Sequence, residues 1–219
     1  MIKRVIALAA LVAVIAVLIP FLGPRERIAA APVQIGRVHK TFHPATGKIY
    51  VLVIGNDARS GNPDQSRADA IHIVGINTER MRGGILNFPR DSWVNIPGRG
   101  SSKINEALYD GGPVLLAKTL ENLTGIRIDY WVMAGFEGFE DMIRAVGGIH
   151  INVRERIYDI GWSGADLKPG KQVVGHSQAL AFNRARHAFA GGDVTRTTNQ
   201  ARFLLWMLKE LRGEVAANP

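Results

Sequence analysis

The 219-residue chain contains no cysteine. Disulfide bonds and thiolate chemistry are therefore excluded, and a zinc site would depend on histidine and carboxylate ligands. The six histidines are scattered without the H-E-x-x-H spacing of zinc enzymes, so His72 is interpreted as a strand residue rather than a metal ligand. The chain also lacks the G-x-x-x-x-G-K-[ST] phosphate-binding loop, which disfavours a nucleotide hydrolase of that class.

A serine-hydrolase triad is missing as well. The segment "GHSQA", residues 175–179, is similar to the turn that carries a nucleophilic serine, here Ser177. The usual order of the catalytic groups requires an acid between that serine and a later histidine. No Asp or Glu lies between Ser177 and His187, so the sequence disfavours a serine hydrolase.

Acidic residues are few relative to basic ones. The chain has 19 Asp and Glu against 27 Lys and Arg, which gives a net charge of +8 and a pI near 10.1. Such an excess indicates an anionic partner: a nucleic acid, a lipid headgroup or a phosphorylated substrate. No helix-turn-helix, zinc-finger or RNP motif accompanies the charge, so the sequence predicts no nucleic-acid partner.

An unbroken apolar run extends from Val5 to Leu22, eighteen residues. A membrane helix needs about 20 such residues and a signal-peptide core about 7 to 15, so the run favours a retained anchor. The alternative is a signal peptide cleaved after the alanines at 29–31. Lys3 and Arg4 before the run favour a cytoplasmic N-terminus. We expect a single-pass protein of the cell membrane with an extracytoplasmic folded part.

Three regions follow from this pattern: a cytoplasmic stub with a transmembrane anchor at 1–22, a proline-containing linker at 23–48, and one folded domain at 49–219. In that domain short runs rich in β-branched residues alternate with helical patterns, which predicts a layered α/β domain. The expected strands are residues 49–55, 70–77, 84–89, 93–96, 130–134 and 149–153. The expected helices are residues 112–125, 136–148 and 192–213.

Two carboxylates stand at expected strand ends. Asp57 follows the first strand in "GNDARSG", and Asp69 precedes the second in "SRADAI". If these strands are neighbours, the two carboxylates approach each other, which requires a cation or arginines to neutralise them. Arg59 and Arg67 are close in sequence. Two solvated loop aspartates are the alternative interpretation.

Several arginines are placed where they can bind an anion. In "NFPRDSW", Arg90 and Asp91 follow an expected strand, and this pair is either a charged turn or part of a site. Arg184 and Arg186 are two residues apart, so in an extended segment both side chains point to one face. Arginine binds phosphate oxygens by paired hydrogen bonds, although a solvated charged surface remains the alternative. Arg196 and Gln200 share one helix face by their i, i+4 spacing.

These motifs together resemble those of the LytR-CpsA-Psr family, from about residue 50 to about residue 206. Members of that family are membrane-anchored bacterial phosphotransferases with an α-β-α domain and a central mixed sheet. They move a glycopolymer phosphate from a polyprenyl pyrophosphate carrier to peptidoglycan. The segments that carry the resemblance are "VLVIGNDARSG", "SRADAIHIVGIN", "ILNFPRDSWVNIPGRGSSKINEALYDGGP", "LENLTGIRIDYWVMAGFEGFEDMIRAVGG", "LKPGKQVVGHSQALAFNRARH" and "GDVTRTTNQ".

The resemblance implies that Asp57 and Asp69 organise Mg²⁺ at the pyrophosphate of a membrane-lipid carrier. It further implies a set of residues that bind the pyrophosphate oxygens: Arg90, Arg184, Arg186, Arg196 and Gln200, with Arg59 and Lys103 as additional residues. Asp91 or Asp57 is the expected base for the acceptor hydroxyl. Asn56 and Ala58 depart from the family, which usually has hydroxyl residues there.

Two other functions share the same anion-binding groups. A pyrophosphatase would pass the phosphoryl group to water, and a binding protein would retain a lipid pyrophosphate without turnover. Phosphoryl transfer needs mainly positioning and charge neutralisation, which the predicted arginines and one hard cation supply. The helix near 112–123 and the final helix are expected to wall an apolar tunnel for the lipid.

Overall fold

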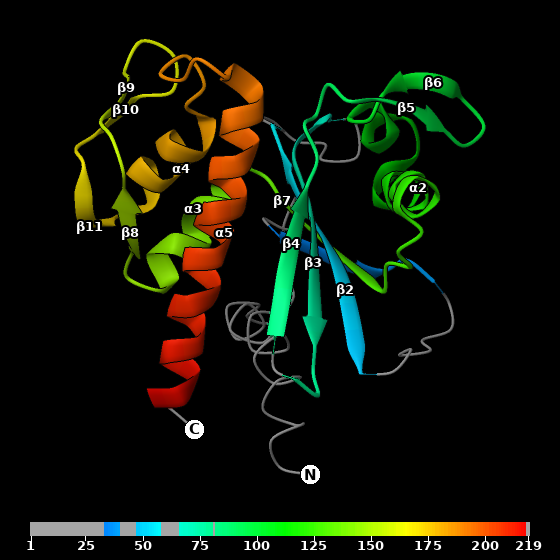
Figure 1. Ribbon diagram of the computed structural model, residues 1–219, viewed down its shortest axis with the longest axis horizontal. Coiled ribbons are helices and arrows are strands. Elements are labelled where there is room, and N and C mark those ends of the chain that lie inside the picture. The colour runs from blue at the N-terminus through cyan, green and yellow to red at the C-terminus, as the bar shows by residue number, and fades with distance from the viewer. Residues whose placement is uncertain (1–32, 40–46, 58–65, 81, 218–219) are drawn as a thin grey trace, which may run out of the picture. The chain divides into compact units, whose positions relative to one another are not determined.

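The computed structural model describes residues 33–39, 47–57, 66–80 and 82–217, with side chains as far as residue 210. In this part the chain forms two compact units, here called the first unit (33–138) and the second unit (139–217) (Figure 1). The expected membrane helix at 5–22 lies outside the described residues. Among the helices that are described, none has the length and apolar character needed to cross a membrane.

The first unit is built on a five-stranded mixed sheet with the order β1-β7-β2-β3-β4. Strands β2 and β7 are parallel, and the other neighbouring pairs are antiparallel. The strands are β1 (Val33–Arg37), β2 (Lys48–Asn56), β3 (Ala68–Asn77), β4 (Arg82–Asn87) and β7 (Tyr130–Ala134). The prediction of an α/β fold with a mixed sheet is therefore confirmed.

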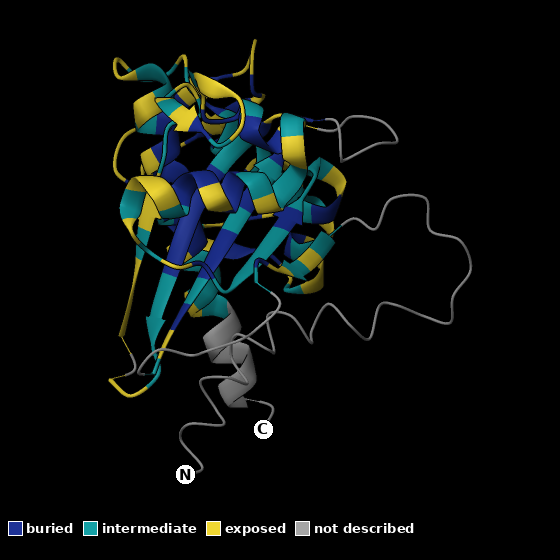
Figure 2. Cartoon of the chain, turned by 90° about the vertical axis from the view of Figure 1, so that its right-hand side faces the viewer, coloured by how far each residue is buried: buried dark blue, intermediate teal, exposed yellow. Residues whose placement is uncertain are grey.

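Helix α2 (Glu106–Thr124) packs on one face of this sheet. Alternate strand residues, such as Leu52 of β2 and Ile73 of β3, are fully buried in one cluster with Leu116 and Leu120 of the helix. This is the pattern that period-two strands and an amphipathic helix produce together. Figure 2 shows the buried positions concentrated along the central strands.

The backbone of α2 is kinked at Gly111 and Gly112, which do not have helical dihedral angles, just before Pro113. The predicted helix start at residue 112 therefore marks the kink, and the helix itself begins at Glu106. At the other end Gly125 has a left-handed φ of 70° and its N–H donates to the Glu121 carbonyl, which ends the helix.

A small antiparallel hairpin, β5 (Trp93–Ile96) with β6 (Gly100–Lys103), completes the first unit. Trp93 and Lys103 are cross-strand partners. The hairpin follows the turn after β4, so it brings Lys103 back towards the end of that strand.

The second unit contains two strand pairs and three helices. Helix α3 (Phe136–Ala145) leads into it, β8 (Ile149–Val153) pairs with β11 (Gly170–Val174), and β9 (Ile157–Asp159) pairs with β10 (Ala165–Leu167). Helices α4 (His176–Arg184) and α5 (Gly192–Ala217) follow. Its core joins these elements through buried side chains, among them Phe182 of α4 and Phe203 of α5, whose rings lie 5.8 Å apart.

All the strands and helices predicted for residues 49–219 are present, but the linker interpretation for 23–48 needs correction. Residues 33–37, within that stretch, form strand β1 and pair with β7, so the folded part begins before residue 49. The sequence "VQIGR" has only two large apolar residues, too few for a recognisable strand pattern. The three-layer α-β-α arrangement stays a prediction.

His72 is a buried strand residue, as the sequence predicted. It lies on β3 opposite Val53 and Asn87 and is 3% exposed. Neither ring nitrogen has a hydrogen-bond partner among the described residues. Burial lowers its pKa from the ordinary value of 6.5 to about 4.

We predict that His72 makes the folded state less stable in acid. The unfolded chain takes up a proton below about pH 6.5, whereas the folded chain does so only near pH 4, so stability falls as the pH falls between these values. The loss attributable to His72 between pH 6.5 and 4.5 is about 2 to 3 kcal/mol. The free energy of unfolding, measured with urea, should therefore fall less between pH 6.5 and 4.5 for His72→Leu than for the wild type, and the difference should equal this amount.

His150→Leu is the matched control, because the His150 side chain is 72% exposed. That variant should follow the wild-type pH dependence. If His72→Leu and the wild type lose stability in parallel, burial of a neutral His72 is not the cause.

Candidate anion-binding site

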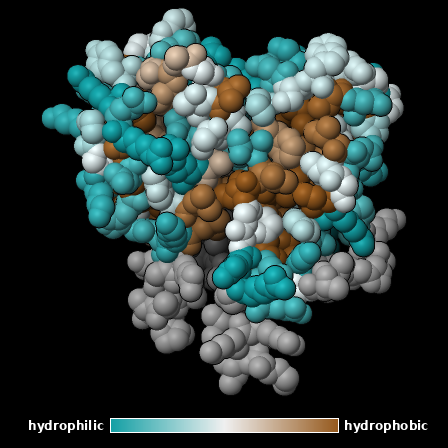
Figure 3. Space-filling view, in the orientation of Figure 1, coloured by the Kyte–Doolittle hydropathy of each residue, from teal (hydrophilic) through white to brown (hydrophobic). Residues whose placement is uncertain are grey.

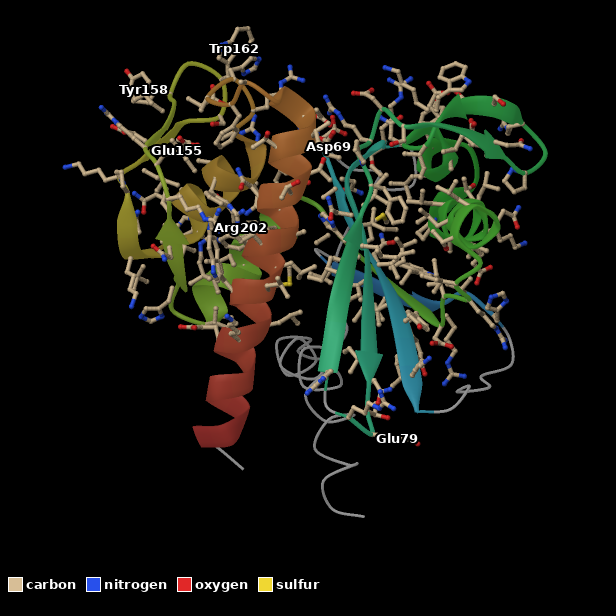
Figure 4. All side chains as sticks on the ribbon, in the orientation of Figure 1. Asp69, Glu79, Glu155, Tyr158, Trp162 and Arg202 are labelled. Atoms are coloured by element: carbon tan, nitrogen blue, oxygen red, sulfur yellow. The ribbon has the colours of Figure 1, made fainter. Side chains whose placement is uncertain are left out.

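Asp57 and Asp69 lie at the same end of neighbouring strands. Strands β2 and β3 are antiparallel, Asn56 pairs with Ala68, and the register shifts between Gly55 and Asn56. Asp57 follows β2 directly, and Asp69 is the second residue of β3. The two strands are therefore neighbours, which is the arrangement under which Asp57 and Asp69 were expected to approach each other. Figure 4 shows Asp69 near one end of the sheet and Glu79 at the other.

Arg90 is the arginine that pairs with Asp69. Strand β4 ends at Asn87, and a turn closed by the Ser92 N–H and the Pro89 carbonyl at 3.0 Å carries Arg90 to the strand end. There its Nη1 donates to Asp69 Oδ1. Arg67 was considered from the sequence as a partner for these carboxylates. Its Nη2 lies instead 3.9 Å from Glu106 Oε1. Arg59 is outside the described residues.

Asp91 and Lys103 extend this pair into a row of alternating charges. Lys103 Nζ donates to Asp91 Oδ1 at 2.8 Å, and Asp91 Oδ2 lies 3.8 Å from Arg90 Nε. The row, here called the strand-end cluster, is Asp69, Arg90, Asp91 and Lys103. Two cations thus compensate the Asp91 charge, which suits Asp91 to hold Arg90 and Lys103 in place.

Asn56 has a buried polar side chain, and it was singled out from the sequence only because the family usually has a hydroxyl residue there. It is 1% exposed, and neither its amide nitrogen nor its amide oxygen has a partner in the described part of the chain. A buried amide without partners costs free energy unless a ligand or water satisfies it. Asn56 directly precedes Asp57 at the strand end, so its unpartnered amide lies in the same part of the sheet as the candidate site.

These residues fit a magnesium ion. Mg²⁺ prefers oxygen ligands and is commonly bound by one or two carboxylates together with substrate phosphates. Asp57, Asp69 and the Asn56 amide oxygen supply such donors at one strand end. Within the described ranges no group of three or more His, Cys, Asp or Glu side chains is gathered for a metal, so a cage made only of protein ligands is not found there.

Arg184 and Arg186 lie in the second unit. Arg184 is the last residue of α4, and the next residue, Ala185, has an extended conformation and is buried. The shared direction expected for an extended segment therefore does not apply, because Arg184 is helical. The Arg186 backbone N–H donates to the buried Asp159 Oδ2 at 3.1 Å, which fixes the chain just after the helix.

Arg196 and Gln200 lie one turn apart near the start of α5, as predicted. Both side chains are buried, and each contacts another residue of the second unit. Arg196 Nη2 is 2.6 Å from Asp193 Oδ1, and Gln200 Nε2 donates to the Asn183 carbonyl at 3.0 Å. These contacts order the two side chains beside the end of α4.

The structure thus joins Asp69, Arg90, Asp91 and Lys103 by direct contacts in the first unit. Arg184, Arg186, Arg196 and Gln200 lie on α4, on α5 and in the segment between them, in the second unit. Binding of one pyrophosphate by both groups stays a prediction. Asp193 was considered from the sequence only as a cap of the last helix, and its ion pair with Arg196 was missed although the i, i+3 spacing signalled it. Nothing local marked the contacts of Asp159.

An apolar pocket of about 370 Å³ lies in the first unit. Its lining includes Tyr50, Ile73, Leu86 and, from the loop after α2, Ile126. Its walls are strands β2 to β4 and this loop. The lipid tunnel expected beside the helix near 112–123 and the final helix stays a prediction. Figure 3 shows apolar residues gathered over these strands. Such a size is within the range of small-molecule sites, about 300 to 1,000 Å³.

Ser177 is not part of a nucleophilic triad. Its Oγ lies 3.0 Å from His176 Nδ1, and the same nitrogen lies 3.4 Å from Glu140 Oε1. A proton relay needs the acid and the serine on different imidazole nitrogens. The prediction against a serine hydrolase agrees with this geometry.

Known proteins are similar to the chain over most of its length. "Probable cell wall biosynthesis protein LcpB" of Corynebacterium glutamicum is 35% identical over 170 residues, which are 72% of this chain and 40% of LcpB. "Polyisoprenyl-teichoic acid--peptidoglycan teichoic acid transferase TagT" of Bacillus subtilis is 34% identical over 173 residues, 75% of this chain and 53% of TagT. The chain spans about half the length of these curated relatives or less.

Solved structures agree with the sequence comparison. The structure of "LytR-CPS2A-psr family protein YwtF (TagT) with bound octaprenyl pyrophosphate lipid" superimposes with a TM-score of 0.66 and 30% identity, covering 78% of this chain and 68% of that one. "TagT bound to LI-WTA" gives a TM-score of 0.70 and 31% identity, covering 82% and 70%. The sequence model of the LytR_cpsA_psr family matches residues 27–214. The chain therefore belongs to the LytR-CpsA-Psr family.

Proposed function

We propose that this protein transfers a glycopolymer phosphate from a polyprenyl pyrophosphate carrier to peptidoglycan. The observation that carries the proposal is the strand-end cluster, in which Asp69 and Asp91 hold Arg90 at the end of the sheet. The names of the relatives point the same way, because TagT is described as a teichoic acid transferase to peptidoglycan and one structure of it has a bound octaprenyl pyrophosphate lipid.

The cluster suits phosphoryl transfer because that reaction depends mainly on positioning and on neutralising oxygen charge. The planar guanidinium of Arg90 can bond two phosphate oxygens at once, and Asp69 and Asp91 limit its rotation. Lys103 adds a second cation on a different strand, β6. The phosphate-binding roles that the family resemblance implies for Arg184, Arg186, Arg196 and Gln200 of the second unit are part of the proposal.

Magnesium is part of the proposal. Asp57 and Asp69 would hold the ion, with the buried Asn56 amide as an additional oxygen donor. When bound, Mg²⁺ would neutralise charge on the pyrophosphate oxygens. The residues of this protein would orient the phosphates and exclude water from them.

The apolar pocket is the proposed site for part of the carrier's polyprenyl chain. Ile73 of its lining is four residues from Asp69 along β3, roughly 13 Å at the rise of a strand. A polyprenyl chain can span that distance while its pyrophosphate lies at the strand end. A membrane-anchored, extracytoplasmic location, with the run at 5–22 as anchor, would place the protein beside such a lipid.

The arginine prediction tests transfer directly. Arg90→Lys, Arg184→Lys and Arg186→Lys each keep the positive charge but lose the planar fork for two phosphate oxygens. Loss of one charge-assisted hydrogen bond in the transition state should cost roughly 1.5 to 3 kcal/mol, or about 10- to 150-fold in kcat/KM. The measurement is transfer of labelled glycopolymer from the lipid carrier to peptidoglycan.

Arg80→Lys is the matched control, because Arg80 is exposed in the turn after β3. It should change transfer less than about twofold, as exposed charges contribute little. If the three site variants behave like this control, the arginines form only a basic surface. Release of free glycopolymer without linkage to peptidoglycan would favour the pyrophosphatase, and binding without turnover the binding protein.

The metal prediction concerns the carboxylates at the strand end. Asp57→Ala and Asp69→Ala should raise the Mg²⁺ concentration needed for half-maximal transfer at least about tenfold, because each removes a proposed oxygen ligand. Glu79→Ala, at the opposite end of the sheet in Figure 4, is the carboxylate control. Circular dichroism checks folding. An unchanged magnesium requirement in both aspartate variants would remove these residues from the metal site.

A further inference from the structure

The β5–β6 hairpin of the first unit has two different faces. On the inner face Ile96 is fully buried, and Val94 packs against the core that the hairpin shares with α2. Successive strand residues point to opposite sides, so Trp93 and Asn95 belong to the outer face. Trp93 is 70% exposed, the largest exposed fraction of any large apolar side chain described in the first unit. The fold thus leaves an indole ring in solvent on a paired strand.

The other residues of the outer face are polar. Trp93 is the cross-strand partner of Lys103, and Asn95 is the partner of Ser101. Cross-strand partners project from the same face, with Cβ atoms about 4.5 to 5.5 Å apart. Asn95, Ser101 and Lys103 are all exposed. The outer face therefore presents one flat aromatic ring together with an amide, a hydroxyl and an ammonium group.

This outer face is continuous with the strand-end cluster. Lys103, the cross-strand partner of Trp93, donates to Asp91 Oδ1 at 2.8 Å. Asp91 Oδ2 in turn lies 3.8 Å from Arg90 Nε. The backbone also joins the two parts, because the Asn105 N–H, just after the hairpin, donates to the Arg90 carbonyl at 3.3 Å. Strand pairing and these contacts thus lead from Trp93 to Arg90, the proposed phosphate ligand, within one unit.

The acceptor of the transfer needs a different kind of site from the donor. The donor carries a pyrophosphate, which arginines and a cation can bind whatever sugar is attached to it. The acceptor hydroxyl belongs to a sugar of the peptidoglycan backbone, which brings no phosphate to the cluster. A sugar ring packs its apolar face on an aromatic ring, while its polar groups bond to side chains nearby. The outer face of the hairpin offers both kinds of contact.

We propose that Trp93 binds the acceptor sugar of peptidoglycan by stacking, next to the strand-end cluster. This inference rests on the proposed function. Asn95 and Ser101 supply an amide and a hydroxyl for hydrogen bonds to the same sugar. Stacking on a ring whose backbone is held in a hairpin restricts the orientation of the sugar, which favours attack by one hydroxyl.

Trp93→Ala tests the proposal, because an exposed side chain can be removed without opening the core. Titration of the full chain with a soluble oligosaccharide of the peptidoglycan backbone should show affinity reduced about 3- to 10-fold, and the KM for this acceptor should rise similarly. Trp93→Tyr keeps an aromatic ring and should retain most of the affinity. Binding of polyprenyl pyrophosphate without sugar should change less than about twofold, as expected for an intact strand-end cluster.

Trp162→Ala is the matched control, because Trp162 of the second unit is 71% exposed. It should bind the oligosaccharide like the wild type. Equal weakening by both alanine variants would show non-specific contact of the sugar with exposed tryptophans, and it would contradict the assignment of Trp93.

Three further outcomes decide between the acceptor, the donor and the function beneath them. If Trp93→Ala weakens binding of the glycopolymer-bearing carrier but not of the oligosaccharide, the face binds the donor's sugar and the inference is wrong. If the wild type transfers and Trp93→Ala binds the oligosaccharide undiminished, the inference is again wrong, although the transferase stands. If the wild type transfers nothing, the proposed function is overturned, and the titration alone decides whether Trp93 binds the peptidoglycan sugar.

Discussion

The ion pair between Asp69 and Arg90 is the interaction on which the site in the first unit depends. Asp69 belongs to β3, and Arg90 to the turn that follows β4, so the pair forms only when these strands are neighbours in the observed register. The pair also neutralises the charge of Asp69, which lies at the same strand end as Asp57. Asp91 and Lys103 then connect the same turn to the β5–β6 hairpin. A change in the sheet register would therefore disperse the whole cluster.

Much of this could be predicted from the sequence because the relevant signals are local. The apolar runs of β2 and β3 predict two strands of the sheet. Asp57 and Asp69 lie at the ends of these strands, and their positions follow from the strand bounds alone. The proline before Arg90 marks the end of a strand, and the charged turn expected in "NFPRDSW" is present, with Arg90 paired to Asp69. The role of this turn in a site stays a prediction. The spacing of Arg196 and Gln200 placed them correctly on one face of α5.

The structural features that could not be predicted from the sequence depend on contacts between residues that are far apart in the chain. The pairing of Arg90 with Asp69, rather than Arg67, requires the β3–β4 register, which no local pattern encodes. Strand β1 is recognisable only beside β7, because two apolar residues, Val33 and Ile35, are too few to establish a strand period. No local pattern marks Asp159, yet it is buried and its side chain accepts the backbone N–H of Arg186, 27 residues later. Contacts of this kind, rather than local sequence patterns, hold the segment after α4 in place.

The central claim, that the first unit binds a lipid pyrophosphate with its lipid in the apolar pocket, is most directly tested at Gly84. Gly84 lines the pocket, and a Cβ there would meet nothing within 4 Å, so Gly84→Phe should fold and fill the space. Titration with polyprenyl pyrophosphate should show affinity reduced at least about tenfold, equivalent to about 1.4 kcal/mol. Gly84→Ala should bind the lipid like the wild type, and inorganic pyrophosphate should bind all three proteins equally. Undiminished binding of polyprenyl pyrophosphate by a folded Gly84→Phe protein would contradict the account.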